Sequence, residues 1–172
     1  MNVKAVARLA ILTCITLVLG YLESLIPLGV APGVKLGLAN TVLLYAVYLM
    51  GPGSAALLML MKVLLSGLLF GGISAMLYSM AGGVLSLSIM LLLRRSRHVG
   101  VIGVSVAGAV CHNIGQLLMA CLMVESRALL GYLPILLISA AVTGLLTGVI
   151  AKYAIKGVQA YAGKKESPHS GD

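Results

Sequence analysis

Apolar residues occupy this chain in long continuous runs, separated by short segments rich in glycine, proline or charge. The runs fall at about 5–22, 34–50, 54–70, 73–93, 99–124 and 133–155. Each run has the length that an α-helix needs to cross a hydrocarbon core of about 30 Å. The alternation of apolar and polar residues that barrel strands require is missing. The pattern therefore predicts an all-α integral membrane protein, a bundle of six transmembrane helices.

The segments between the runs divide the chain further. The first break, residues 23–33, contains Pro27 and Pro32, which favours an ordered loop over a flexible tether. Beyond the last run the chain becomes polar. We therefore expect a transmembrane domain at 1–156 and a polar cytoplasmic tail at 157–172 that lacks stable structure.

Composition supports a lipid environment. Hydrophobic residues make up 60% of the chain and charged residues 9%, against about 45–50% and about 25% in average soluble domains. A soluble domain of this size has too little interior to bury so much apolar surface. We expect a multi-pass protein of a prokaryotic plasma membrane, with the lipid bilayer as its surroundings.

The basic residues indicate how the helices are oriented. The formal net charge is +8, but the basic residues gather at helix ends and not on one polar face with aromatic residues, so we exclude a nucleic-acid partner. With the N-terminus inside, most of the twelve basic residues lie on the cytoplasmic side: Lys4, Arg8, Arg94, Arg95, Arg97, Lys152, Lys156, Lys164 and Lys165. This asymmetry predicts that both termini are cytoplasmic.

The sequence contains few of the residues and motifs that catalyse reactions. The only aspartate is Asp172, and no phosphate-binding loop or serine-nucleophile motif is present. The cysteines Cys14, Cys111 and Cys121 lie inside apolar runs without metal-ligand spacing. We expect no catalytic residue, metal or cofactor, and hence no enzyme activity of the chain on its own.

Polar side chains at membrane depth are the candidate functional residues, because burying them in lipid is costly. In the fifth run, His112 and Gln116 lie one helical turn apart, and Asn113 lies about 100° away. His112 and Gln116 share a stripe with Ser105, Gly108, Gly115 and Met119. We interpret His112, Asn113 and Gln116 as ligand-binding residues. The alternative is that they hold helices together, as polar and small residues do in membranes.

Other runs offer additional candidates. In the fourth run, Ser79 is a predicted ligand contact, although the small residues around it favour helix packing, as does Gly144-x-x-x-Gly148 in the sixth run.

Near the first break we expect Glu23, Lys35 and Asn40 to bind ligand. Lys35 either attracts an anion at a helix N-terminus or anchors the helix at lipid headgroups. Lys62 lies deep in the third run, where it either pairs inside the protein or extends to the interface.

Several of these segments together resemble a known family. The segments are Val6-Ala7-Arg8-Leu9-Ala10, Leu19 to Pro27, Gly33 to Asn40 and Gly108-Ala109-x-x-His112-Asn113-x-Gly115-Gln116. They resemble the Gx transporter family, whose members are often labelled heptaprenyl diphosphate synthase component I. That family looks like the substrate-binding S components of energy-coupling factor (ECF) transporters.

The resemblance implies a six-helix S component that captures a small vitamin-like or isoprenoid-related molecule for import. It also implies partners, an ECF T component and two ATPase subunits. The T component would dock on small residues of the first helix, here Ala7, Ala10 and Cys14. The rival interpretation is a non-catalytic accessory component of polyprenyl (heptaprenyl) diphosphate synthesis, because such synthases hold magnesium and diphosphate with Asp-rich motifs that this chain lacks.

Overall fold

The chain folds into an all-helical bundle. A computed structural model describes residues 3–25, 37–96 and 98–166, and no strand occurs within these ranges. The helices are α1 (Val3–Leu25), α2 (Leu38–Leu49), α3 (Pro52–Ser66), the π-helical turn η1 (Gly67–Gly71), α4 (Gly72–Arg94), α5 (Val101–Val124), the 3₁₀ helix η2 (Arg127–Tyr132) and α6 (Leu133–Glu166). The prediction of an all-α chain is confirmed.

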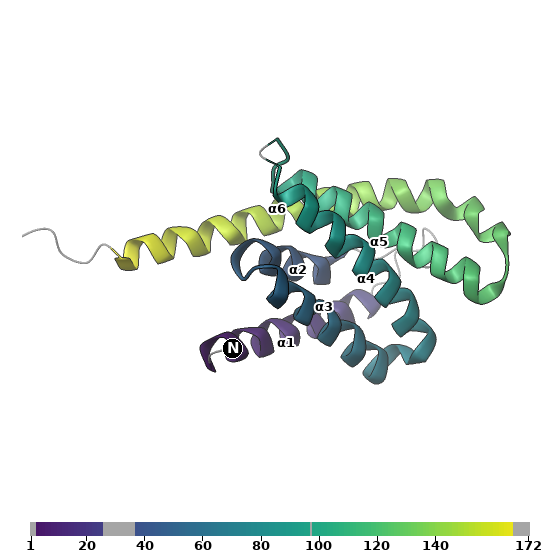
Figure 1. The fold of residues 1–172 in the computed structure, drawn as a ribbon, viewed down its shortest axis with the longest axis horizontal. Helices are drawn as coiled ribbons and strands as arrows, with labels where there is room; N and C mark the ends of the chain where they lie inside the picture. The colour runs from purple at the N-terminus through teal and green to yellow at the C-terminus, as the bar shows by residue number, and fades with distance from the viewer. Residues whose placement is uncertain (1–2, 26–36, 97, 167–172) are drawn as a thin grey trace, which may run out of the picture.

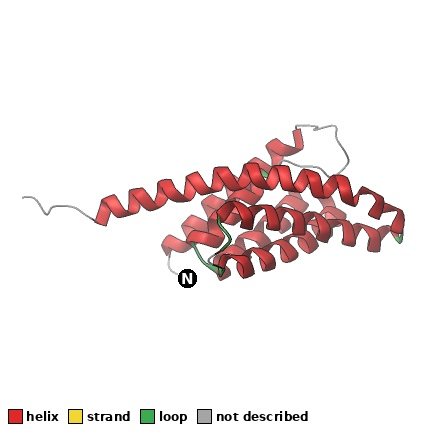
Figure 2. Cartoon of the chain, turned by 90° about the horizontal axis from the view of Figure 1, so that it is seen from above, coloured by secondary structure: helices red, strands yellow, loops and turns green. Residues whose placement is uncertain are grey.

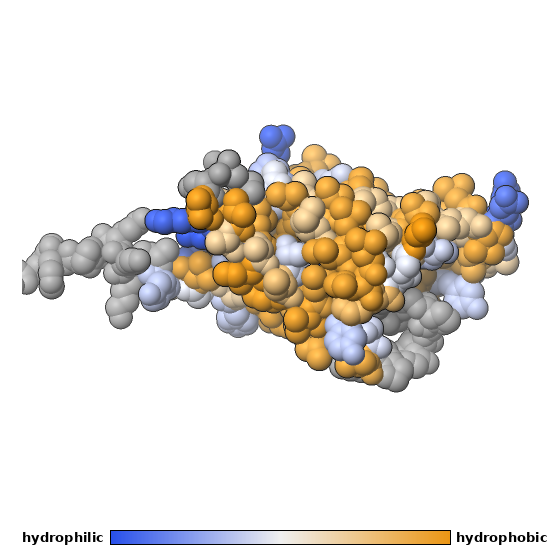
Figure 3. All heavy atoms as spheres, turned by 90° about the horizontal axis from the view of Figure 1, so that it is seen from below, coloured by the Kyte–Doolittle hydropathy of each residue, from blue (hydrophilic) through white to orange (hydrophobic). Residues whose placement is uncertain are grey.

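Four helical stretches of the described chain are long and apolar enough to span a membrane. They are Val3–Leu25, Pro52–Arg94, Val101–Val124 and Arg127–Tyr161, and the shorter Leu38–Leu49 is also apolar. The chain is therefore a multi-pass membrane protein. Hydrophobic residues cover most of the middle of the face in Figure 3, as a lipid-facing surface requires.

The stretch Pro52–Arg94 does not run straight. Its 43 residues far exceed the length of one crossing, and it turns at Gly72, whose φ of 71° is a conformation that favours glycine. Beyond the turn the chain folds back on itself. Met76 packs against Gly67, and Met59 packs against Gly83. Residues at similar distances before and after the turn thus meet, so α3 and α4 form an antiparallel hairpin.

The helices α4, α5 and α6 form a second antiparallel set, in which α4 and α6 each pack extensively against α5 (Figure 1). Glycines allow the backbones of these helices to approach closely. A Cβ at Gly115 would lie 2.8 Å from the Ala81 carbonyl oxygen, and one at Gly144 would lie 2.8 Å from the Val106 Cα. Only glycine permits such contact between helix backbones, which is how membrane helices gain packing energy without a hydrophobic driving force.

The helix α2 is the most enclosed element. Leu44, Ala46 and Val47 are fully buried, and they share one apolar core with residues of α3, α4 and α5 such as Leu58 and Val104. Among the described helices α2 is also short, with 12 residues, which corresponds to a length of about 18 Å. It is therefore shorter than a hydrocarbon core of about 30 Å, and Asn40 in its first turn is half-buried inside the protein.

Arg94 fastens the C-terminal end of α4 to that of α2. Its guanidinium donates to the carbonyl oxygens of Val47 and, at 3.4 Å, of Tyr48, and it lies 5.6 Å from the centre of the Tyr48 ring. These bonds satisfy carbonyl groups that the end of a helix leaves unpaired. They also show that α2 and α4 end on the same side of the bundle.

The structure corrects two boundaries. The last helix, α6, continues to Glu166 and projects beyond the bundle (Figure 2), although we expected the tail from residue 157 to lack structure. The alanines and lysines after Ile155 are good helix formers, so the helix outlasts its apolar part. Glu23 belongs to the last turns of α1 and not to the following loop. The predicted loop beyond Leu25 and the predicted start of the second helix, with Lys35, lie outside the described residues.

Candidate functional site

A cavity of about 280 Å³ lies within the bundle and has walls from all the α-helices. Its lining comes from the helix halves nearest the α1–α2, η1 and η2 connections, which is the end of the bundle away from Arg94. The polar residues that line it are Thr16, Glu23, Ser24, Asn40, Lys62, Ser66, Ser79, His112, Asn113, Gln116, Thr143 and Thr147. A polar chamber inside an apolar bundle is the expected form of a small-molecule site in a membrane protein.

Glu23 joins the cavity wall of α1 to the start of α2. Its side chain is only 7% exposed, and its Oε1 accepts a hydrogen bond from the Leu38 backbone N–H. The preceding residue, Gly37, has φ 76°, a left-handed conformation that lets the chain turn into the helix. The carboxylate thus caps a free N–H at the positive end of the α2 dipole, which compensates its burial.

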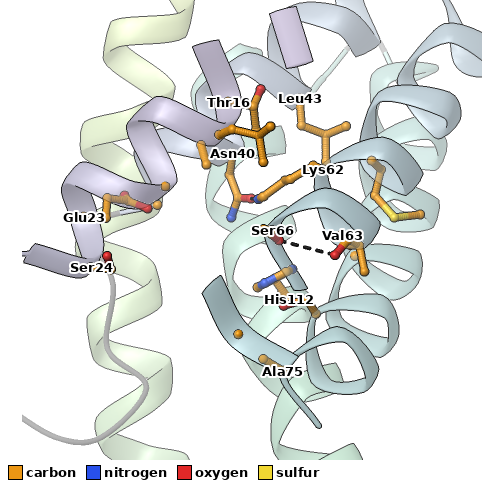
Figure 4. Close-up of a pocket in the computed structure, with 18 of the residues that line it drawn as sticks. Thr16, Glu23, Ser24, Asn40, Leu43, Lys62, Val63, Ser66, Ala75 and His112 are labelled. Carbon is orange, nitrogen blue, oxygen red and sulfur yellow. Dashed lines mark hydrogen bonds between the residues drawn. The ribbon is translucent and has the colours of Figure 1, made fainter. Parts of the chain in front are cut away.

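Lys62 and Asn40 form the polar centre of the cavity. The Lys62 Nζ donates to the Asn40 Oδ1 at 3.0 Å, and Figure 4 shows both side chains in the space between α1 and α3, with Glu23 on the opposite wall. Lys62 therefore pairs inside the protein and does not extend to the lipid interface, which settles the alternatives left open by the sequence.

The wall formed by α4 and α5 depends on Gly82. A Cβ there would lie 2.7 Å from the His112 carbonyl oxygen, 3.0 Å from its Nδ1 and 2.8 Å from the Gln116 Cγ. His112 and Gln116 thus occupy space that Gly82 leaves open. The neighbouring Asn113 donates its Nδ2 hydrogen to the Leu136 carbonyl oxygen at 3.0 Å, which links α5 to α6.

The predicted stripe on α5 divides into two roles. His112, Asn113 and Gln116 line the cavity, whereas Gly108 contacts Met90 and Gly115 contacts α4. Ser105 hydrogen-bonds to the Thr147 hydroxyl of α6 at 3.1 Å. The packing interpretation thus holds for the small residues of the stripe. It also holds for Gly144 and Gly148, which lie against the backbone of α5.

The structure brings together every predicted ligand-binding residue that it describes. Glu23, Asn40, Ser79, His112, Asn113 and Gln116 all line this cavity. Their contact with a ligand stays a prediction, and Lys35 lies outside the described residues. Ser79, His112, Asn113 and Gln116 lie on the side of the cavity formed by α4 and α5. The walls contributed by α1, α2 and α3 enclose the other side of the cavity.

Sequence reasoning missed several lining residues on α1 and α3. Gly20 follows Thr16 by four residues and precedes Glu23 by three, and Ser66 follows Lys62 by one turn. These spacings put each set on one helix face, so the signal was present. Tyr21 and Phe70 also line the cavity, with ring centres 5.2 Å apart. That contact between α1 and η1 has no signature in the sequence.

The predicted docking residues lie away from the cavity. Ala7, Ala10 and Cys14 are all exposed on α1, whereas Leu9 and Thr13 on the other face are buried. The small residues thus face outward in this chain, where a partner helix has access. Their role in docking stays a prediction.

Long apolar helices around an internal polar cavity define the chain as a helical membrane protein. Residues 12–154 match the family model described as heptaprenyl diphosphate synthase component I. The chain therefore belongs to that family, and the resemblance seen in its motifs is confirmed. No curated protein and no solved structure significantly matches the chain.

Proposed function

We propose that this protein is the membrane-embedded substrate-capture (S) subunit of an ECF-type importer. The observation that carries the proposal is the polar cavity around Lys62, which is enclosed by apolar helices. Polar and ionisable groups at membrane depth are costly and are kept mainly where they serve a substrate path or site. The cavity volume of about 280 Å³ suits a small molecule of vitamin size or the polar part of an isoprenoid-related one.

In the proposed topology the chain crosses the plasma membrane of a prokaryote six times, with both termini in the cytoplasm. The hairpin of α3 and α4 supports two crossings in the stretch Pro52–Arg94. The basic residues Lys4, Arg8, Arg94 and Arg95 lie at the end of the bundle away from the cavity, which the positive-inside rule assigns to the cytoplasm. The cavity is then in the outer half, where an external ligand arrives first.

Import needs an energy source, which partners would supply. In this proposal an ECF T component docks on the exposed face of α1 at Ala7, Ala10 and Cys14, and two ATPase subunits complete the importer. Small side chains allow a partner helix to approach closely, and van der Waals contact then stabilises the pair in lipid. Ligand release to the cytoplasm would follow from movement of the bundle against that partner.

The family description favours a second function, an accessory component of polyprenyl diphosphate synthesis. In that role the protein would bind an isoprenoid or a soluble synthase subunit at the membrane. Catalysis would belong to the partner, since Asp172 is the sole aspartate of this chain and cannot form an Asp-rich magnesium site.

Purification in mild detergent followed by native mass spectrometry tests the two functions. The importer requires that a T component and ATPases copurify and that the protein retains a small molecule. Lys62→Met or His112→Ala should weaken retention by about 5- to 150-fold, as expected for about 1–3 kcal/mol from a lost hydrogen bond. Lys152→Met, the same change at an exposed position of α6, is the control and should retain the molecule.

Two results would reject the importer. Recovery of a soluble prenyl synthase subunit without ATPases would favour the accessory role. Equal retention by the parent, Lys62→Met and His112→Ala would show that the cavity is not the binding site.

A further inference from the structure

A second cavity, of about 390 Å³, adjoins the first at the η2 end of the bundle. Ala75, Ser79, Asn113 and Gln116 line both cavities. Two spaces that share four wall residues are neighbours. The shared set comes from α4 and α5, so the junction lies between these two helices.

The two cavities differ in chemistry. The first contains Lys62, Glu23 and His112. Beyond the shared residues, the described lining of the second consists of Tyr78, Leu117, Ala120, Leu129, Tyr132 and Leu136, with no charged side chain. A ligand that is polar throughout would leave this second space without matching contacts, because apolar walls stabilise apolar groups.

The polar cavity favours a head with hydrogen-bond-accepting oxygens. Lys62 is the cation among its described lining residues, and Asn40, His112, Asn113 and Gln116 all carry N–H groups. The carboxylate of Glu23 has the opposite charge, but it accepts the Leu38 N–H at the start of α2 and lies on the α1 wall. The α3 and α5 walls, which are the donor side, lead to the junction with the apolar cavity.

We infer that the ligand is an amphiphile, with an anionic oxygen-rich head in the polar cavity and a hydrocarbon tail in the adjoining apolar cavity. This inference rests on the proposed function for the role of the site, and it narrows the substrate class. The shared residues Ser79, Asn113 and Gln116 surround the point where head and tail join. Ala75, with its small side chain, leaves room for the tail between α4 and α5.

Binding of methyl phosphate and hexyl phosphate to the detergent-purified full chain tests the inference. The head is the same in both probes, and only the tail differs. Each methylene that becomes buried should raise affinity by up to about fourfold, so hexyl phosphate should bind at least tenfold more tightly. Ala120→Phe and Leu129→Phe fill the apolar cavity from two different elements. Each should remove most of this gain and leave methyl phosphate binding unchanged, which also shows that the variant is folded.

Three outcomes would overturn the inference. The first is that hexyl phosphate binds the parent no more tightly than methyl phosphate. The second is that its higher affinity persists in both Ala120→Phe and Leu129→Phe. The third is that neither probe binds the parent. The result is independent of partner proteins, since the assay uses the isolated chain. Tight hexyl phosphate binding by a protein that never copurifies with ATPases would therefore reject the importer and leave the amphiphile site in place.

Discussion

Replacing Gly115 by alanine tests the structure at a close backbone contact between α4 and α5. The new Cβ would lie 2.8 Å from the Ala81 carbonyl oxygen and 2.9 Å from the Gly82 Cα. Both are backbone atoms and cannot rotate away, so the helix axes must separate. Overpacking of this kind costs about 1–3 kcal/mol, whereas alanine stabilises a helix by about 0.5–1 kcal/mol relative to glycine. The two effects together leave a net loss of stability between about 0 and about 2.5 kcal/mol, with the middle of the range near about 1 kcal/mol.

The matched control is Gly20→Ala, because no atom of the described residues outside its own stretch of α1 lies within 4 Å of a Cβ at that position. This variant should be about 0.5–1 kcal/mol more stable than the parent, because only the higher helix propensity of alanine acts there. Unfolding in mixed SDS micelles, followed by far-ultraviolet circular dichroism, measures both variants. If Gly115→Ala proves as stable as Gly20→Ala, the close α4–α5 contact and the cavity wall that depends on it are incorrect.

The remaining predictions concern topology, a buried hydrogen bond and docking. A cysteine at Ser96 should react with an impermeant thiol reagent only in opened cells, and one at Ala128 in intact cells, and labelling of the Ser96 position from outside would reject the proposed orientation. Ser105→Ala should cost only about 0.6 kcal/mol, because the Thr147 hydroxyl keeps its bond to the Thr143 carbonyl at 2.9 Å. A double-mutant cycle of Ser105→Ala with Thr147→Val measures the energy of this hydrogen bond, and a coupling energy above about 2 kcal/mol would contradict the prediction. Ala10→Leu should abolish pull-down of a T component while the cavity still retains its ligand, and undiminished pull-down would exclude α1 as the docking surface.

Much of the architecture could be predicted from the sequence because the membrane imposes a simple length rule. The uninterrupted apolar run at 99–124 predicted α5, which the structure places at Val101–Val124. The polar residues His112, Asn113 and Gln116 stood out within this run, because uncompensated polar groups in lipid are costly. Glycine at 71 and 72 marked the turn between α3 and α4, where a positive φ is required.

Tertiary structure decided which of these groups meet. Lys62 was ambiguous in the sequence, because its partner Asn40 is on another helix and their pairing depends on the α2–α3 register. Glu23 seemed to belong to a loop, and only the approach of α1 to α2 shows that it caps Leu38. The apolar cavity beside Gln116 exists because four separate elements leave space between them. The pattern along a chain determines helix length and the energetic cost of each side chain, whereas contacts between helices arise from close packing of surfaces far apart in sequence.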